Sequence, residues 1–121
     1  MNVEDNVGYG LKIKKMPKAE IARRVAEALK LVQLEDYGKR MPDQLSGGMQ
    51  RRLALARALA LGGSWYLLDE PFAGVDRERA QRILQRIRKL NVPVLLASHE
   101  EYVLEQADRV IRLDGPPLYV R

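Results

Sequence analysis

Apolar and polar positions follow a helical spacing through the first half of the chain. From residue 21 to residue 32 apolar side chains recur every three or four positions, with charged side chains on the other faces: Ile21, Val25, Ala28, Leu29 and Val32. This spacing predicts an amphipathic helix. Pro17 lies where that helix can start, because its missing N–H costs nothing in a first turn. The earlier stretch "VEDNVGYGL" predicts a short helix that Gly8 and Gly10 interrupt.

The next helical pattern begins at a serine and two glycines. Ser46 is a favourable N-cap residue, because its side-chain oxygen can accept a backbone N–H of the first turn. The spacing that follows predicts a helix from about residue 47 to residue 60, with Leu53, Ala56 and Ala60 on one side. Gly38 and Pro42 mark the preceding stretch as a loop.

Near residue 61 the pattern changes, and helical spacing alternates with short apolar runs. "WYLLD" and "VPVLLA" predict buried strands, and "VIRL" predicts a third strand. Asp76 is placed to cap a helix after the first strand, and "EEYVLEQA" predicts a short helix before the third. A turn at Asp114–Gly115 can pair "VIRL" with "LYV".

The order of these elements predicts the fold class. A β-α-β-α-β order indicates an α/β fold with a parallel sheet and helices on its faces. We therefore expect a helical subdomain over residues 1–61. Residues 62–121 should form a partial parallel sheet of about three strands plus a terminal hairpin, with flanking helices.

Composition narrows the class of protein. The 121 residues favour a single domain, and no apolar run approaches the roughly 20 residues needed to cross a bilayer. The chain has no cysteine, so it has neither disulfides nor a cysteine metal cluster, which fits a cytosolic protein. The net charge is +5, and the excess of basic residues lies in residues 1–60. We read this excess as a solvated helical surface rather than a nucleic-acid site, since few aromatics accompany it.

Two acidic residues follow the first predicted strand, and the only histidine follows the second. The carboxyl ends of parallel strands meet at the edge where open α/β sheets bind ligands, so Asp69, Glu70 and His99 should lie together there. Asp69 can hold Mg²⁺ through water, Glu70 can polarise an attacking water, and His99 can donate to a phosphate oxygen. Taken singly, each also fits an ordinary role: a capping carboxylate or an incidental loop histidine.

The sequence "LSGG" predicts an anion site. Gly47 and Gly48 leave the first turn of the helix bare, so that its backbone N–H groups can approach a phosphate, and the helix dipole adds to the attraction. An ordinary capped helix start would show the same four residues.

In combination, these segments resemble a known family. "LSGGMQRRLALARAL", "WYLLDEPFAGVD" and "LLASHE" resemble, in order and spacing, the signature motif, Walker B, D-loop and H-switch of ATP-binding cassette (ABC) ATPases. The region before Ser46 resembles the helical subdomain of importer-type members. Met49 replaces the usual glutamine of the signature, and Ala73-Gly74-Val75-Asp76 replaces the usual Ser-Ala-Leu-Asp of the D-loop.

The resemblance implies roles for particular residues. Ser46, Gly47, Gly48 and Asp76 would contact nucleotide, Asp69 would hold Mg²⁺, and Glu70 and His99 would be catalytic. The implied cofactors are ATP and Mg²⁺. The implied partners are a second ATPase subunit, identical or different, and transmembrane permease subunits, with no specific nucleic acid. The implied location is cytoplasmic, at the inner face of the membrane.

One family element is absent from the sequence. The Walker A loop G-x-x-x-x-G-K-[ST] does not occur, since Gly38-Lys39 is followed by Arg40 and Gln33 stands where the first glycine should be. The resemblance therefore fits the family domain from just after its Q-loop, and we expect a truncated subunit that does not hydrolyse ATP alone. Two alternatives stay open: a non-catalytic module that docks on a partner ATPase or membrane subunit, and a non-transport ABC ATPase acting on nucleic acid.

Overall fold

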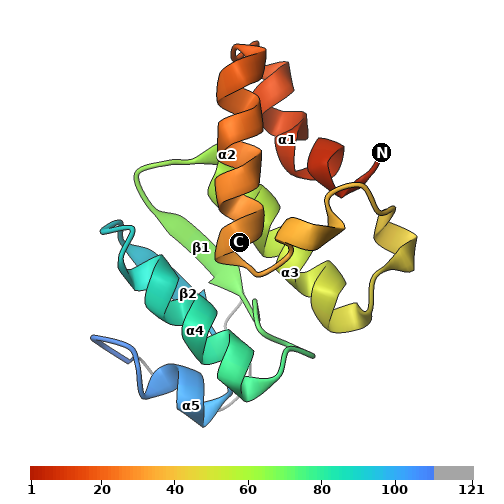
Figure 1. The fold of residues 1–121 in the computed structure, drawn as a ribbon. Helices are drawn as coiled ribbons and strands as arrows, with labels where there is room; N and C mark the ends of the chain where they lie inside the picture. Colours follow the sequence, from red (N-terminus) through yellow and green to blue (C-terminus); the bar gives the residue numbers. More distant parts are fainter. Residues whose placement is uncertain (111–121) are drawn as a thin grey trace, which may run out of the picture.

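The computed structural model describes residues 1–110, a mixed α/β arrangement in which helices predominate (Figure 1). The helices are α1 (Val3–Ile13), α2 (Lys18–Leu31), α3 (Gly47–Leu61), α4 (Arg77–Arg88) and α5 (Glu101–Leu104), and the strands are β1 (Tyr66–Asp69) and β2 (Val94–Ala97). Short 3-10 turns at Glu35–Tyr37 and Pro42–Gln44 join α2 to α3. The alternation of strands and helices after α3 confirms the α/β expectation.

Helix α1 runs without interruption, so the expected break at its glycines is wrong. The side chain of Asn2 caps it by accepting the backbone N–H of Asp5 at 2.8 Å. Its glycines lie where neighbouring helices come close: a Cβ on Gly8 would be 3.1 Å from methyl carbons of α2, and one on Gly10 would be 2.8 Å from Leu61. Close packing against α2 and α3 therefore outweighs the low helix propensity of glycine.

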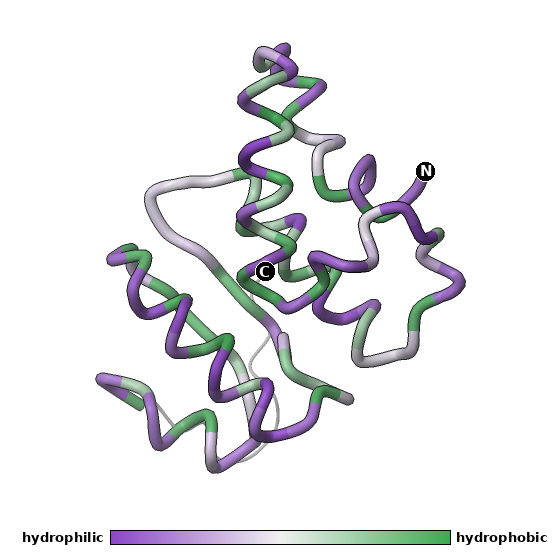
Figure 2. The backbone as a smooth tube through the Cα atoms, in the orientation of Figure 1, coloured by the Kyte–Doolittle hydropathy of each residue, from purple (hydrophilic) through white to green (hydrophobic). Residues whose placement is uncertain are grey.

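Helix α2 has the amphipathic character that its spacing predicts. It follows Pro17, and its apolar stripe is buried at Val25, Ala28 and Leu29, with Val32 at its C-terminal end also buried and Ile21 half-buried. Figure 2 shows hydrophilic and hydrophobic positions alternating around the helix. Its outer face carries arginine–glutamate ion pairs three and four residues apart, which add small increments of helix stability.

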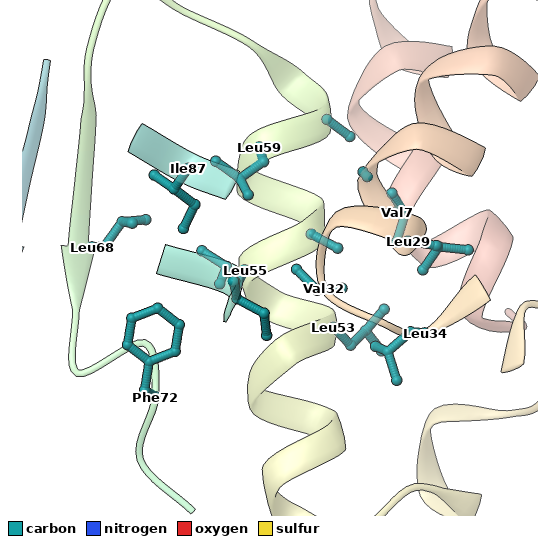
Figure 3. Close-up of a cluster of buried hydrophobic side chains, with 14 of the residues drawn as sticks. Val7, Leu29, Val32, Leu34, Leu53, Leu55, Leu59, Leu68, Phe72 and Ile87 are labelled. Carbon is teal, nitrogen blue, oxygen red and sulfur yellow. The ribbon is translucent and has the colours of Figure 1, made fainter. Parts of the chain in front are cut away.

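Helix α3 is the centre of the core, and more of its surface is buried than the sequence pattern predicts. Leu53 lies on the side of Val32 and Leu34, whereas Leu55 and Leu59 face the opposite side (Figure 3). That second side packs toward β1 and α4, and Leu68 of β1 and Ile87 of α4 lie next to it (Figure 3). One continuous hydrophobic core thus joins the helical part to the sheet. The expected boundary at residue 61 stays a prediction.

The two strands form a parallel pair within the described residues, with Tyr66 opposite Val94 and Asp69 opposite Ala97. α4 is the crossover between them, and its N-cap is Asp76, as predicted. The third strand expected at "VIRL" and the hairpin at Asp114–Gly115 lie almost entirely outside the described residues. The sheet that the structure describes is therefore smaller than the one the sequence predicts.

Within residues 1–110 the sheet is covered on one face only, and β1 and β2 are not fully buried there, in contrast to the expectation. Leu68 is buried, but its neighbour Leu67 and the cross-strand partner Leu95 are each 61% exposed. Successive side chains of a strand point to opposite faces, and only the face toward α3 and α4 is covered in the described part of the chain. Trp65, which directly precedes β1, is also largely exposed. We call Trp65, Leu67 and Leu95 the open sheet face.

Among residues 1–110, no helix combines the length and the apolar character that a membrane crossing requires.

Candidate functional site

The N-terminus of α3 has the geometry of an anion site. Ser46 caps the helix, and its side-chain oxygen accepts the backbone N–H of Met49 at 3.2 Å. The N–H groups of Gly47 and Gly48 belong to the first turn and have no acceptor within the helix. Ser46 and Gly47 are exposed, and no atom lies within 4 Å of the place that a Cβ on Gly47 would take. The first turn can therefore be approached from solvent, as the sequence predicts.

Gly48 brings the first turn of α3 against the turn that follows β1. A Cβ on Gly48 would lie 2.3 Å from the carbonyl oxygen of Gly74, a separation that real side chains do not tolerate. Gly74 adopts φ 76°, a left-handed conformation that glycine takes without strain. Gly48 is thus required by the contact between two segments that are distant in the sequence, and Gly74 is favoured by its backbone conformation.

A pocket of about 270 Å³ opens beside this contact. Its lining comes from the start of α3 and from the turn leading into α4: Ser46, Gly48, Met49, Arg52, Gly74, Val75, Asp76 and Arg79. The Asp76 carboxylate accepts the backbone N–H of Arg79 at 3.0 Å. It also forms an ion pair with the Arg79 guanidinium at 3.8 Å. The structure therefore places the predicted residues Ser46, Gly48 and Asp76 around one hollow.

The predicted catalytic residues meet at the carboxyl edge of the sheet. Glu70 immediately follows β1, and its backbone N–H donates to the carbonyl oxygen of Ala97 at 2.8 Å. One carboxylate oxygen of Glu70 accepts the backbone N–H of His99 at 3.1 Å and lies 2.6 Å from its ring Nδ1. An ionised carboxylate only accepts, so a hydrogen bond from the ring to an ionised Glu70 uses the tautomer with the proton on Nδ1, which leaves Nε2 for another contact. Glu70 itself has φ 44°, which is unusual for a residue other than glycine.

Asp69, the last residue of β1, lies beside Glu70 and is exposed. Within the described residues no group of three or more histidine, cysteine or acidic side chains is arranged to hold a metal ion. A single carboxylate nevertheless suits Mg²⁺, which is commonly bound by one or two carboxylates together with water and substrate phosphates. Asp69 therefore fits the role of a single protein ligand to Mg²⁺ whose other ligands are water and phosphate oxygens. It does not form a metal site by itself.

Three residues that the sequence analysis did not identify, Arg52, Arg79 and Gln33, lie next to this site and are joined by hydrogen bonds. Arg52 of α3 is only 3% exposed and donates to the carbonyl oxygens of Val32 at 2.8 Å and Gln33 at 3.1 Å. Burial lowers the pKa of its guanidinium, and Arg79 lowers it further. Arg79 in turn donates to the side chain of Gln33 at 2.9 Å. One sequence signal was present: Arg52 stands three and four positions before Leu55 and Ala56, on the buried side of the helix.

Comparison with known proteins gives a consistent result. The family model described as ABC transporter matches residues 1–73. The spermidine/putrescine import ATP-binding protein of Oleidesulfovibrio alaskensis is 47% identical over 92% of this chain and 31% of its own length. The sulfate/thiosulfate import ATP-binding protein of Nocardia farcinica is 46% identical over 91% of this chain and 35% of its own length. This chain therefore spans about one third of the length of these relatives.

A solved structure shows the same arrangement of elements. It is described as a dimeric structure of a bacterial ABC transporter cassette. The two chains superpose with a TM-score of 0.80 at 34% sequence identity, over 87% of this chain and 49% of the other.

Proposed function

This chain belongs to the ABC transporter family. We propose that it carries two sets of residues of an importer-type ATP-binding subunit: the signature motif, and the residues for ATP hydrolysis at the carboxyl edge of the sheet. The two relatives described above are both import proteins, which supports the importer assignment. The observation that carries the proposal is the 2.6 Å contact between Glu70 and His99 at the carboxyl edge of the sheet. It joins the two residues that the family resemblance assigns to hydrolysis.

The residues of this chain have distinct tasks in the proposed reaction. ATP with Mg²⁺ supplies the γ-phosphate and the positive charge that balances it. Glu70 polarises the water that attacks that phosphate, and His99 fixes the orientation of its carboxylate. Asp69 is the protein ligand for the cation, directly or through water. The first turn of α3 offers the N–H groups of Gly47 and Gly48 to the phosphates of a nucleotide held by a second ATPase subunit.

The proposed assembly follows from this division of tasks. If the signature motif contacts a nucleotide that another subunit holds, two ATPase subunits must pair. Import also requires transmembrane permease subunits. A solved cassette of the same fold is described as dimeric, which supports the pairing. We place the chain on the cytoplasmic side of the membrane, bound to the permease.

The proposal is tested by supplying the part of the domain that this sequence lacks. The chain would be fused behind the segment that precedes the matched region in the Oleidesulfovibrio alaskensis relative, where the resemblance expects the Walker A loop. We expect phosphate release by the fusion protein and none by the chain alone. We call Ser46, Gly47 and Gly48, at the start of α3, the signature face. Ser46→Arg should abolish phosphate release by filling this face, whereas Ser64→Arg, at another exposed serine, should not. A fusion protein that folds and binds ATP but releases no phosphate would contradict the proposal.

The chain by itself should bind ATP only weakly. The sequence contains no Walker A loop, and the backbone N–H nest and lysine of that loop supply most contacts to the β- and γ-phosphates in this class of enzyme. Isothermal titration with ATP and Mg²⁺ should therefore show no binding in the low micromolar range, which corresponds to about −8 kcal/mol. A dissociation constant of that size would reveal another phosphate cradle in residues 1–121.

The open sheet face favours one further candidate function, a docking module for a partner ATPase. Leu67 and Leu95 are paired across the two strands and are both exposed, which is unusual for a strand pair of this hydrophobicity. The outer edge of β2 is also unpaired within the described residues. Exposed apolar strands of this kind recruit other chains.

We expect the purified chain to associate, and we expect the open sheet face to be responsible. Light scattering should show a mass above that of a monomer. The double variant Leu67→Thr, Leu95→Thr should shift the mass toward the monomer, because threonine keeps β propensity while removing apolar surface. Ile13→Thr is the matched control, since Ile13 is 63% exposed on α1, far from the strands in sequence. A monomer with one cooperative melting transition above about 65 °C would show that this face needs no partner.

A further inference from the structure

The end of α2 has an unusual backbone conformation. Gln33 directly follows the C-cap residue Val32 and has φ 61°, in the left-handed region that glycine adopts without strain. Its N–H donates to the carbonyl oxygen of Lys30 at 3.1 Å and so ends the helix. Strain of this kind persists only where surrounding contacts hold the residue in place.

Two arginines from later in the chain supply those contacts. The carbonyl oxygen of Gln33 accepts from Arg52 of α3 at 3.1 Å, and its side-chain oxygen accepts from Arg79 of α4 at 2.9 Å. The partners are 19 and 46 positions away in the sequence. Hydrogen bonds from charged donors are about twice as strong as neutral ones.

The same two arginines come from two different elements that meet at the pocket beside the start of α3. Arg52 lies in the second turn of α3, after Gly48, and Arg79 lies in the first turn of α4, after Asp76. Both line the pocket of about 270 Å³. Two guanidinium groups around one hollow repel each other, and Gln33 provides an acceptor for each of them. One residue just beyond the C-terminal end of α2 therefore connects α3 to the start of α4, which Asp76 caps.

We propose that Gln33 is a positioning residue for the signature face, which sets the place of the Gly74–Asp76 turn relative to the first turn of α3 through Arg79 and Arg52. This inference rests on the proposed function, because it concerns the face that closes over a nucleotide. Gln33 does not touch that nucleotide. It acts through the two arginines.

The variant Gln33→Gly distinguishes a positioning role of Gln33 from a contribution to the overall stability of the fold. Glycine accepts the left-handed conformation and keeps the carbonyl acceptor for Arg52, but it deletes the acceptor for Arg79. We expect an unchanged or higher melting temperature for the chain. We also expect amide hydrogen exchange to rise about tenfold or more at the hydrogen-bonded amides of this region, with α1 and α2 unchanged. These amides are Met49, Gln50, Val75 and Arg79.

Two further variants complete this part of the test. Lys15→Gly is the matched control, since Lys15 has φ 59° and its N–H likewise donates to the carbonyl oxygen three residues earlier, in Lys12. It should raise stability without any change at the signature. Gln33→Glu keeps an acceptor for Arg79 and should retain the exchange rates of the unmodified chain. Unchanged exchange in Gln33→Gly, or a rise spread over all helices with a lower melting temperature, would overturn the proposal.

The second measurement connects positioning with turnover. In the fusion protein that hydrolyses ATP, Gln33→Gly should lower kcat by about tenfold to a hundredfold, since small displacements of positioning groups have effects of this size. The KM for ATP should change by less than about threefold. Unchanged kcat would contradict the inference. If the unmodified fusion protein shows no hydrolysis, the proposed function fails, whereas the exchange experiment still tests the link between Gln33, α3 and the turn.

Discussion

In the fusion protein described above, Glu70→Gln is expected to lower the rate of ATP hydrolysis by about 10²–10⁴-fold, the usual contribution of a general base. The amide keeps the shape of the side chain and still accepts the backbone N–H of His99 through its oxygen, but it cannot take a proton from water. Nucleotide binding should persist, because Glu70 polarises the attacking water and does not hold the phosphates. Phosphate release and equilibrium nucleotide binding, measured on the same preparation, separate the two effects.

A matched control exists on the first turn of α4. Glu78→Gln removes the same charge from an exposed glutamate that forms an ion pair with Arg82, four residues along the same helix. It should leave hydrolysis within about twofold, as expected for a surface ion pair of small energy. If Glu70→Gln also leaves hydrolysis within a few-fold, Glu70 is not the general base, and the contact with His99 must serve the structure of the strand edge.

Gly48→Ala should destabilise the chain by about 1–3 kcal/mol, the range seen when a tightly packed site receives an additional methyl group. The new Cβ would stand 2.3 Å from the carbonyl oxygen of Gly74, and that oxygen belongs to the backbone, so no side-chain rotation can relieve the contact. Thermal unfolding should show a fall in Tm of about 3–10 °C for a domain of this size.

The adjacent glycine provides the control. A Cβ on Gly47 would meet nothing within 4 Å, and alanine is the better helix former, so Gly47→Ala should be neutral or slightly stabilising. The two variants make the same chemical change at neighbouring positions of one helix. Equal melting temperatures for both would show that the turn at Gly74 moves away from α3 without cost, and that the two segments do not depend on each other.

Local signals made much of this chain predictable from its sequence. The caps at Ser46 and Asp76 depend on a side chain and a backbone N–H only three residues further along. The apolar spacing of α2 likewise depends on neighbours three and four residues apart. The order of the motifs and the placement of Glu70 and His99 at one sheet edge follow from strand and helix order alone. These features require no knowledge of how distant segments pack.

Features that depend on distant segments were missed or predicted wrongly. The glycines of α1 read as helix breakers, yet they are the positions where side chains of α2 and α3 come so close that a Cβ would be tightly packed against them. Strand β1 read as buried on both faces, but burial depends on what covers each face, and Leu67 is exposed. No local sequence pattern indicates the proposed role of Gln33. That role depends on contacts with Arg52 and Arg79, which are 19 and 46 positions away in the sequence.

Within residues 1–110 the sequence by itself determined the order of the helices and the two strands, where α2, α3 and α4 begin, and which residue types reach the edge of the sheet. Those properties are set by neighbours within one helical turn or by strand order. Only the tertiary structure decided that Glu70 and His99 share a hydrogen bond, that Gly48 and Gly74 touch, and that Arg52 donates to the carbonyl oxygens of Val32 and Gln33. Each of these depends on the three-dimensional approach of segments that are far apart in the chain, which close packing of side chains around α3 brings about.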